Sequence, residues 1–409
     1  MKKFRIVTVA LGLLLLNTVF AQAPRELYQS GLAKYNNKDY NGAIADFNQA
    51  IALNAQYDMA YHNRGLAKLA LKDYDGAMSD MNQAIAINPN YANAYNDRGQ
   101  IWLRQNNYSS ASADFDKAIS LDANYVVAYT NRANARYAMK NYTGANDDYN
   151  KLIVFDANNP DAYAGRSLIK VYMKDYQGAV DDASKAITIN PNLAVAYLSR
   201  GNARYELSDY DNAISDYNRV VVLQPDNMNV YYNLGNLYSK RNNSSDAIKN
   251  YERYIVLAPN EWQGYKGLGD VYYYQVKDYN KSLDYYTRAY NINKNEKEII
   301  QNYGYSLMRL NRSPEAMKLF NAQISYLPDD PWGYYNLGAV YSYNKQNDDA
   351  VRQLSVALDK KMTELDYWQN DPYLDNVRVT PGFQAIVRKY FTPDEIRKRP
   401  NLFIVVNRN

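Results

Sequence analysis

Two charged residue types recur at one fixed spacing, and together they could form ion pairs. An arginine appears at 34-residue intervals in five places: Arg64, Arg98, Arg132, Arg166 and Arg200. An aspartate follows the same interval in six: Asp46, Asp80, Asp114, Asp148, Asp182 and Asp216. A guanidinium and a carboxylate that recur together predict a ladder of structural ion pairs. The spacing leaves open which aspartate meets which arginine. The other interpretation is an arginine row that grips an anionic ligand.

The remaining composition excludes several kinds of chemistry. The 409 residues contain no cysteine and one histidine, His62, so zinc sites built on cysteine or histidine, iron–sulfur clusters and thiol nucleophiles lack their ligands. No GxxxxGKS/T, GxSxG or HExxH motif is present, and His62 has no evident triad partners. We therefore predict no enzymatic activity, no cofactor and no metal. The 47 basic residues nearly balance the 43 acidic ones, which argues against binding to nucleic acid.

Small residues repeat at the same interval and indicate how these side chains are positioned. Ala133 and Ser167 fill two gaps in a series of glycines: Gly31, Gly65, Gly99, Gly201, Gly235, Gly269, Gly304 and Gly338. A second small residue follows each of them, as Ala247 follows Gly235. A glycine inside a helix costs about 1 kcal/mol relative to alanine. The missing side chain must therefore allow two helix backbones to approach each other closely.

Each interval contains two helical patterns separated by a short polar break. We expect a polar residue in that break to cap the second helix: Asn41, Asp75, Ser109, Thr143, Asp211 and Ser245. Because so short a pair cannot bury its own apolar face, the pairs must stack into one continuous core. We predict an all-α fold, an α-solenoid of ten stacked antiparallel helix pairs. These repeats begin near residues 24, 58, 92, 126, 160, 194, 228, 262, 297 and 331.

The repeats resemble a known family. One of them is similar to the tetratricopeptide repeat through the spacing of Tyr231, Leu234, Gly235, Tyr238, Ala247, Tyr251 and Pro259, and the resemblance extends over residues 22–361. It implies a right-handed superhelix whose first helices line a concave groove that usually binds a peptide or protein. Two departures are a one-residue insertion near Gln275 to Lys277 and Gln323 where an alanine is expected. The clamp that family members use for a chaperone's terminal carboxylate is not recognisable, because Lys266 is followed by Asp270 where an asparagine is needed.

The implied groove contains two groups of candidate binding residues. An aromatic group lies by phase at its C-terminal end: Tyr273, Tyr274, Tyr305, Met308, Trp332, Tyr335 and Tyr343. Tyrosine and tryptophan give large contact area at low entropic cost, so we predict that this group contacts a partner. Recurring amides could hold the backbone of an extended peptide: Asn131, Asn134, Asn202, Asn233 and Asn236. The alternative is that neighbouring helices satisfy these amides.

The N-terminal residues are typical of a signal peptide. Residues 1–21 combine a basic start, an apolar run from Ile6 to Leu16, and small residues suited to cleavage after Ala21. The alternative is an uncleaved membrane anchor, but the apolar run is shorter than the roughly 20 residues that a spanning helix needs. We therefore expect export to the periplasm or cell envelope, with no stable membrane span after cleavage.

The C-terminal residues resemble the segment that often closes such arrays in bacterial proteins. Asp371, Pro372, Leu374, Pro381 and Phe383 carry this similarity. A terminal repeat exposes apolar surface, so we predict a helical cap over residues 362–391. Residues 392–409 form a tail that packs on the cap or lies in the groove, and we favour the cap.

These observations predict an exported scaffold that binds a protein or peptide in its groove, within a cell-envelope assembly. The alternative from another class is a carbohydrate-binding protein of the cell wall or surface, in which the aromatic groove stacks on sugar rings. A structural spacer is a third possibility.

Overall fold

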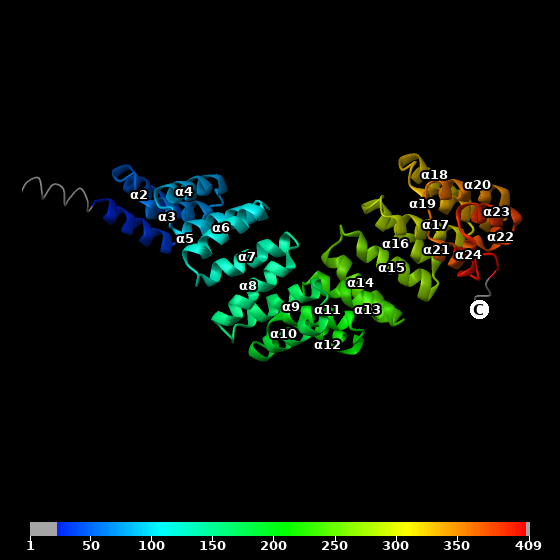
Figure 1. The fold of residues 1–409 in the computed structure, drawn as a ribbon, viewed down its shortest axis with the longest axis horizontal. Helices are drawn as coiled ribbons and strands as arrows, with labels where there is room; N and C mark the ends of the chain where they lie inside the picture. Colours follow the sequence, from blue (N-terminus) through cyan, green and yellow to red (C-terminus); the bar gives the residue numbers. More distant parts are fainter. Residues whose placement is uncertain (1–22, 406–409) are drawn as a thin grey trace, which may run out of the picture. The chain divides into compact units, whose positions relative to one another are not determined.

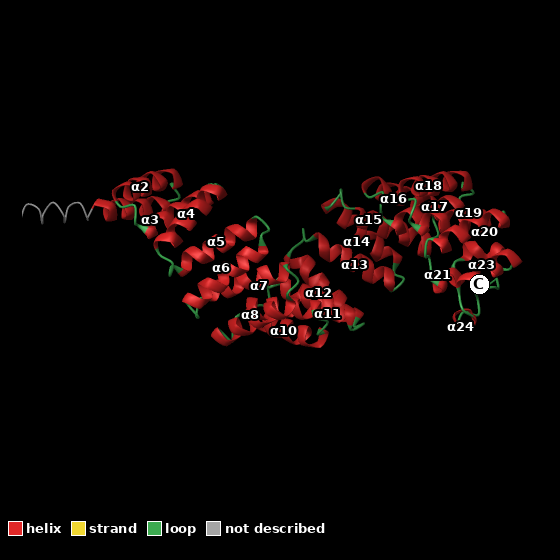
Figure 2. Cartoon of the chain, turned by 45° about the horizontal axis from the view of Figure 1, so that its top comes forward, coloured by secondary structure: helices red, strands yellow, loops and turns green. Residues whose placement is uncertain are grey.

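The computed structural model describes residues 23–405, and helices joined by short loops make up that part of the chain (Figure 2). No strand occurs among these residues, which confirms the predicted all-α class. The predicted signal peptide lies outside the described residues. The chain divides into two compact halves, Met1–Asp216 and Tyr217–Asn409, called the N-terminal and C-terminal halves below.

The N-terminal half consists of antiparallel helix pairs that follow one another along the chain (Figure 1). They are residues 23–36 with α2 (Tyr40–Leu53), α3 (Asp58–Ala70) with α4 (Tyr74–Ile87), α5 (Ala92–Arg104) with α6 (Tyr108–Leu121), α7 (Val126–Ala138) with α8 (Tyr142–Phe155), α9 (Pro160–Tyr172) with α10 (Tyr176–Ile189), and α11 (Ala194–Glu206) with α12 (Tyr210–Leu223). The division between the halves falls within α12.

The C-terminal half continues the same pattern and adds a group of short helices. Its pairs are α13 (Met228–Lys240) with α14 (Ser244–Leu257), α15 (Trp262–Asp270) and η1 (Val271–Val276) with α16 (Tyr279–Ile292), α17 (Lys297–Arg309) with α18 (Ser313–Tyr326), and α19 (Pro331–Tyr343) with α20 (Asn347–Asp359). The short helices are α21 (Leu365–Asn370), η2 (Pro372–Leu374), α22 (Asp375–Arg378), α23 (Pro381–Tyr390) and α24 (Pro393–Arg397). The helices fit the ten predicted repeats, whereas the right-handed superhelix stays a prediction.

The caps of the second helices lie two residues before the positions expected from sequence. The cap side chains accept a backbone N–H in seven repeats, and they are Asp39, Asp73, Asn107, Asn141, Asp175, Asn243 and Asp278. The expected residues, such as Asn41 in α2, are already helical. The expected cap positions were wrong because the turn between the two helices is shorter than the polar stretch of sequence that marks it. The last polar residues of that stretch therefore belong to the second helix. One residue in the left-handed conformation, Lys38 in the first repeat, turns the chain directly into the cap.

The recurring glycines make room for a side chain of the second helix as well as for its backbone. A Cβ built on Gly235 would lie 2.7 Å from the ring of Tyr251, closer than atoms in contact can come. At Gly65 the same atom would lie 3.4 Å from the carbonyl oxygen of Ala77. Ser167 is tolerated at this position because its hydroxyl donates to the carbonyl oxygen of Ala179, at 2.8 Å. The loss of helix propensity at glycine is therefore offset by packing of the two helices in a pair.

The extra residue of the eighth repeat is absorbed by a π-helix. The α-helix α15 ends at Asp270, and η1 continues to Val276 as a π-helix, in which each backbone hydrogen bond spans five residues instead of four. Gln275 fixes this segment to the preceding repeat, since its amide donates to the carbonyl oxygen of Ser239 at 2.9 Å. Lys277 then adopts a left-handed conformation with φ of 61°, and α16 begins normally. The insertion therefore changes the positions of Tyr273 and Tyr274 without disturbing the next helix.

The short C-terminal helices share one core with the last three repeats. Trp368 and Leu374 are fully buried in that core, together with residues of α17 and α19. Arg378 is also fully buried and donates to the carbonyl oxygens of Trp368, Gln369, Asp371 and Asn401. Leu402 belongs to the same core and is 1% exposed, so the described part of the tail packs on the cap.

Candidate functional site

The recurring arginines and aspartates of the N-terminal half pair within their own repeat. The guanidinium Nε and Nη2 of each arginine donate to an aspartate 16 residues later, as in Arg98 with Asp114 and Arg166 with Asp182. Asp46, for which sequence offered no arginine, accepts from Lys34 Nζ at 2.7 Å and from Ser30 Oγ at 2.6 Å. The geometry thus assigns every aspartate of the series a partner in its own helix pair.

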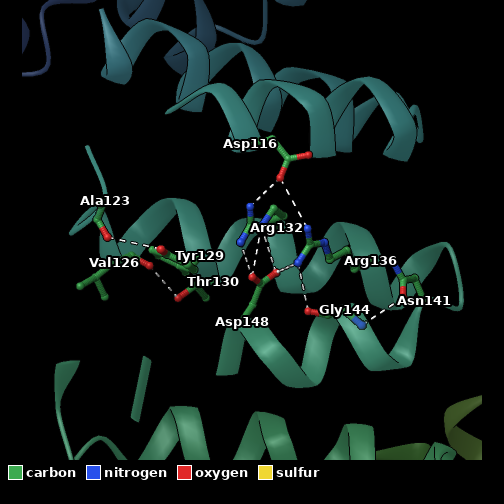
Figure 3. A network of polar contacts seen from close by, with 10 residues as sticks. All are labelled: Asp116, Ala123, Val126, Tyr129, Thr130, Arg132, Arg136, Asn141, Gly144 and Asp148. Atoms are coloured by element: carbon green, nitrogen blue, oxygen red, sulfur yellow. Dashed lines mark hydrogen bonds and ion pairs between the residues drawn. The ribbon is translucent and has the colours of Figure 1, made fainter. Parts of the chain in front are cut away.

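Each arginine also reaches the preceding repeat and so joins three helices. In Figure 3, Arg132 on α7 points toward Asp148 on α8 and toward Asp116 on α6. Its Nη2 lies 2.5 Å from Asp148 Oδ1, and Arg136 Nη1 lies 2.9 Å from Asp148 Oδ2. Asp148 is 1% exposed, and burial raises its pKa while the two guanidinium groups oppose that change. These contacts support the structural interpretation of the arginine row, since its donors are used within the chain.

The amides proposed to hold a peptide backbone lie in different surroundings. Asn131 donates to Asn96 Oδ1 at 3.0 Å, and Asn236 accepts from the Tyr251 hydroxyl at 2.7 Å. Asn134 is exposed, whereas Asn202 and Asn233 are half-buried and have partners of their own. At Asn131 and Asn236 the neighbouring helices use the amides, as the second interpretation of this group expects.

The aromatic group predicted from the sequence lies in the C-terminal half, and much of it is covered. Met308 and Tyr335 have no exposed surface, and Tyr273 and Tyr305 are 7% and 6% exposed. Trp332 and Tyr343 are half-buried, while Tyr274 is 58% exposed. In this conformation only the last three can offer appreciable contact area. The role of this group in binding stays a prediction.

The cap covers these aromatic residues, which the sequence did not show. Asp371 is buried and accepts from the hydroxyls of Tyr305 and Tyr335, at 2.9 and 2.7 Å. Two residues later in the chain, the hydroxyl of Tyr373 forms a hydrogen bond with the hydroxyl of Tyr273, at 2.5 Å. Burial raises the pKa of Asp371, against the lowering effect of these hydrogen bonds. The spacing of residues could not predict this contact, because it joins positions 36 to 100 residues apart.

Two cavities remain beside the covered residues, and they share Tyr274 and Tyr367. The first has a volume of about 490 Å³, and its lining includes Tyr273, Lys277, Arg309 and Tyr373. The second has a volume of about 680 Å³, and its lining includes Lys266, Asp270, Asn302 and Trp332. Both volumes lie in the range of ligand-binding cavities, and aromatic rings with a few polar groups are the usual lining. We call the two cavities together the tyrosine site.

The two parts of the tyrosine site differ in charge. In the larger cavity, Lys266 Nζ pairs with Asp270 at 2.9 Å and with Glu298 at 2.8 Å. In the smaller cavity, the guanidinium of Arg309 lies 5.6 and 5.4 Å from the ring centres of Tyr279 and Tyr373. Sequence reasoning missed Arg309, Tyr367 and Tyr373, since the first ends a helix without following the repeat pattern and the others belong to the cap.

His62 has partners that could not be found from sequence motifs. Its Nε2 lies 2.7 Å from Asp97 Oδ2, and its Nδ1 lies 3.1 Å from the Tyr91 hydroxyl. These residues are 35 and 29 positions away in the chain, so the contacts of His62 could not be read from a local motif. Burial raises the pKa of Tyr91, which makes its hydroxyl a poor nucleophile. The arrangement links adjacent helices and offers no activated nucleophile.

No group of three or more metal-binding side chains is present within residues 23–405. None of the described helices has the length and apolar composition that crossing a membrane requires.

The consecutive antiparallel helix pairs define the class of protein as an α-solenoid. Family models described as TPR repeat or tetratricopeptide repeat match residues 27–57, 59–91, 92–125, 201–242 and 232–296. The chain therefore contains tetratricopeptide repeats.

Solved structures of similar fold include two bacterial proteins. A tetratricopeptide repeat protein from Parabacteroides merdae is 17% identical with a TM-score of 0.51, over 61% of this chain and 98% of that one. The C-terminal part of a TPR repeat-containing protein from Cytophaga hutchinsonii is 19% identical with a TM-score of 0.47, over 59% and 99%. At such identities the first likeness shows the fold alone. No curated protein matches this chain.

Proposed function

We propose that this protein is an exported, non-catalytic scaffold that binds a protein or peptide at the tyrosine site, within a cell-envelope assembly. The tetratricopeptide-repeat fold is typical of protein–protein interaction. The observation that carries the proposal is the pair of cavities on either side of Tyr274 and Tyr367. The signal-peptide pattern of residues 1–21 supports export.

The tyrosine site suits a peptide better than a compact small molecule. Tyr274 is exposed and stands at the border of both cavities, and its hydroxyl donates to Asn302 Oδ1 at 3.2 Å. An extended peptide chain lying across the Tyr274 ring would reach Lys277 and Arg309 in the smaller cavity and Trp332 in the larger one. Large rigid rings lose little entropy on binding, which is why they dominate protein interfaces.

Photocrosslinking tests the proposal directly. A benzoylphenylalanine placed at position 274 should capture a defined protein from extracts of the native envelope. Capture through a crosslinker at position 367 should fall when Tyr274→Ala and Trp332→Ala are combined. Tyr326→Ala is the matched control, since this tyrosine is 71% exposed in the same half and outside both cavities. Binding to isolated wall material without any captured protein would refute the proposal in favour of carbohydrate binding.

Export is tested separately by the mature N-terminus. We expect mass spectrometry of the native protein to find Gln22 as the first residue. An intact Met1 in protein from the envelope would contradict the cleavage that the proposal includes.

A further inference from the structure

The smaller cavity of the tyrosine site carries positive charge that the chain itself does not neutralise. Its lining includes Lys277, Arg309 and a single carboxylate, Asp371. That carboxylate is buried, and its oxygens accept from Tyr305, Tyr335 and the backbone N–H of Tyr373. The accessible charge of the cavity is therefore cationic.

Neither cation has a carboxylate partner within residues 23–405. Arg309 is exposed at the end of α17 and stacks on Tyr279 and Tyr373, which leaves its N–H donors free of ion pairs. Lys277 is held at the cavity by its left-handed conformation after η1. The adjacent Asp278 accepts from the backbone N–H of Lys281 as the cap of α16. The five recurring arginines of the N-terminal half differ, since each of them binds an aspartate of its own repeat.

Resting on the proposed function, we propose that the smaller cavity binds a carboxylate of an acidic peptide segment of the partner. A guanidinium held by stacking presents its donors in one plane, and that plane matches the two oxygens of a carboxylate. The tyrosine rings around it supply contact area for the peptide chain and its neighbouring side chains. Lys277 occupies the left-handed turn position that recurs in the repeats, whereas Arg309 lies at a helix end beside the cap.

Fluorescence anisotropy with two labelled peptides tests the charge requirement. The full chain should bind hexaglutamate and not hexaglutamine, and added salt should weaken the binding because exposed charges are screened. Arg309→Gln and Lys277→Gln should each weaken hexaglutamate binding by about tenfold, the usual effect of losing a hydrogen bond to a charged group. Arg288→Gln is the control, since this arginine pairs with Asp284 on the same half and does not line the cavity.

The outcomes separate this inference from the proposed function. Because Arg309 contacts the cap, unchanged circular dichroism and Trp368 fluorescence must accompany its effect; Lys277 is exposed, so its substitution provides a second measure if Arg309→Gln misfolds. Equal binding of hexaglutamine, or binding that both substitutions leave unchanged, would overturn the inference. Binding of tri-galacturonic acid in place of hexaglutamate would assign the site to acidic sugars and overturn it too. If crosslinking at position 274 still captures a protein in Arg309→Gln, the proposed function stands and only the acidic-peptide inference fails.

Discussion

Replacing Arg132 by leucine should destabilise the N-terminal half by about 3 kcal/mol. The substitution removes three hydrogen bonds to Asp148, which is 1% exposed, and one to Asp116. Removing one partner of a buried ion pair costs about 3 to 5 kcal/mol, because the other charge is left buried. Arg136 keeps its contact with Asp148, so we expect the lower end of that range.

The loss of stability caused by Arg132→Leu should be smaller at low pH than at neutral pH. Burial raises the pKa of Asp148 above its value in the unfolded chain, and loss of Arg132 removes one group that opposes this rise. A raised folded pKa means that the folded state holds its proton more tightly, so stability falls as the pH rises through that interval. The free energy of unfolding of Arg132→Leu should therefore be closer to that of the native protein near pH 4 than at pH 7.

Urea unfolding combined with hydrogen exchange measures this effect. Exchange resolves α7 and α8 from the rest, which matters because long repeat arrays need not unfold in one step. Arg288→Leu is the control: its pair with Asp284 is more than half exposed, and such pairs contribute about 0.3 to 0.5 kcal/mol. If Arg132→Leu is no less stable than this control, the arginine row is not structural. Loss of binding to an anionic ligand in the same variant would then favour the ligand-gripping interpretation.

Three further predictions follow from single contacts. Gly235→Val should cost about 2 kcal/mol in urea unfolding, since its side chain must displace the ring of Tyr251; equal stability would show that the space is not needed. Arg378→Met should loosen the cap and increase binding of an apolar dye, because four carbonyl oxygens lose a buried donor; an unchanged dye signal would refute this role. Burial raises the pKa of Asp371, so the stability of the native cap should fall as the pH rises from about 4 to 7. Trp368 fluorescence measures this stability, and Asp371→Asn should not show the fall.

The repeating part of the structure could be predicted because one physical requirement recurs in every helix pair. Gly235 and its equivalents mark where two helices meet, and the interval between them gives the number of pairs. The capping residues were misplaced by two positions because sequence pattern does not show where the turn at Lys38 tightens.

The candidate site could be predicted only in part. The phase of the repeats placed Tyr274 and Trp332 on a surface, and both line a cavity. It did not predict that Asp371 would bury Tyr305 and Tyr335, because the cap belongs to no repeat. The repeat phase also did not single out Arg309. This residue is of interest because no carboxylate among residues 23–405 pairs with it, and only the fold shows which side chains surround it.

The π-helix of the eighth repeat suggests how a repetitive chain can gain a unique surface. One added amino acid rotates Tyr273 and Tyr274 about the helix axis, while the usual left-handed turn at Lys277 and the cap at Asp278 start α16 as in the other repeats. Deleting that amino acid would return the segment to the common pattern and would remove Tyr274 from its place between the two cavities. Insertions of this size, which sequence alignments score as gaps, are therefore the positions at which relatives with different ligands should be compared first.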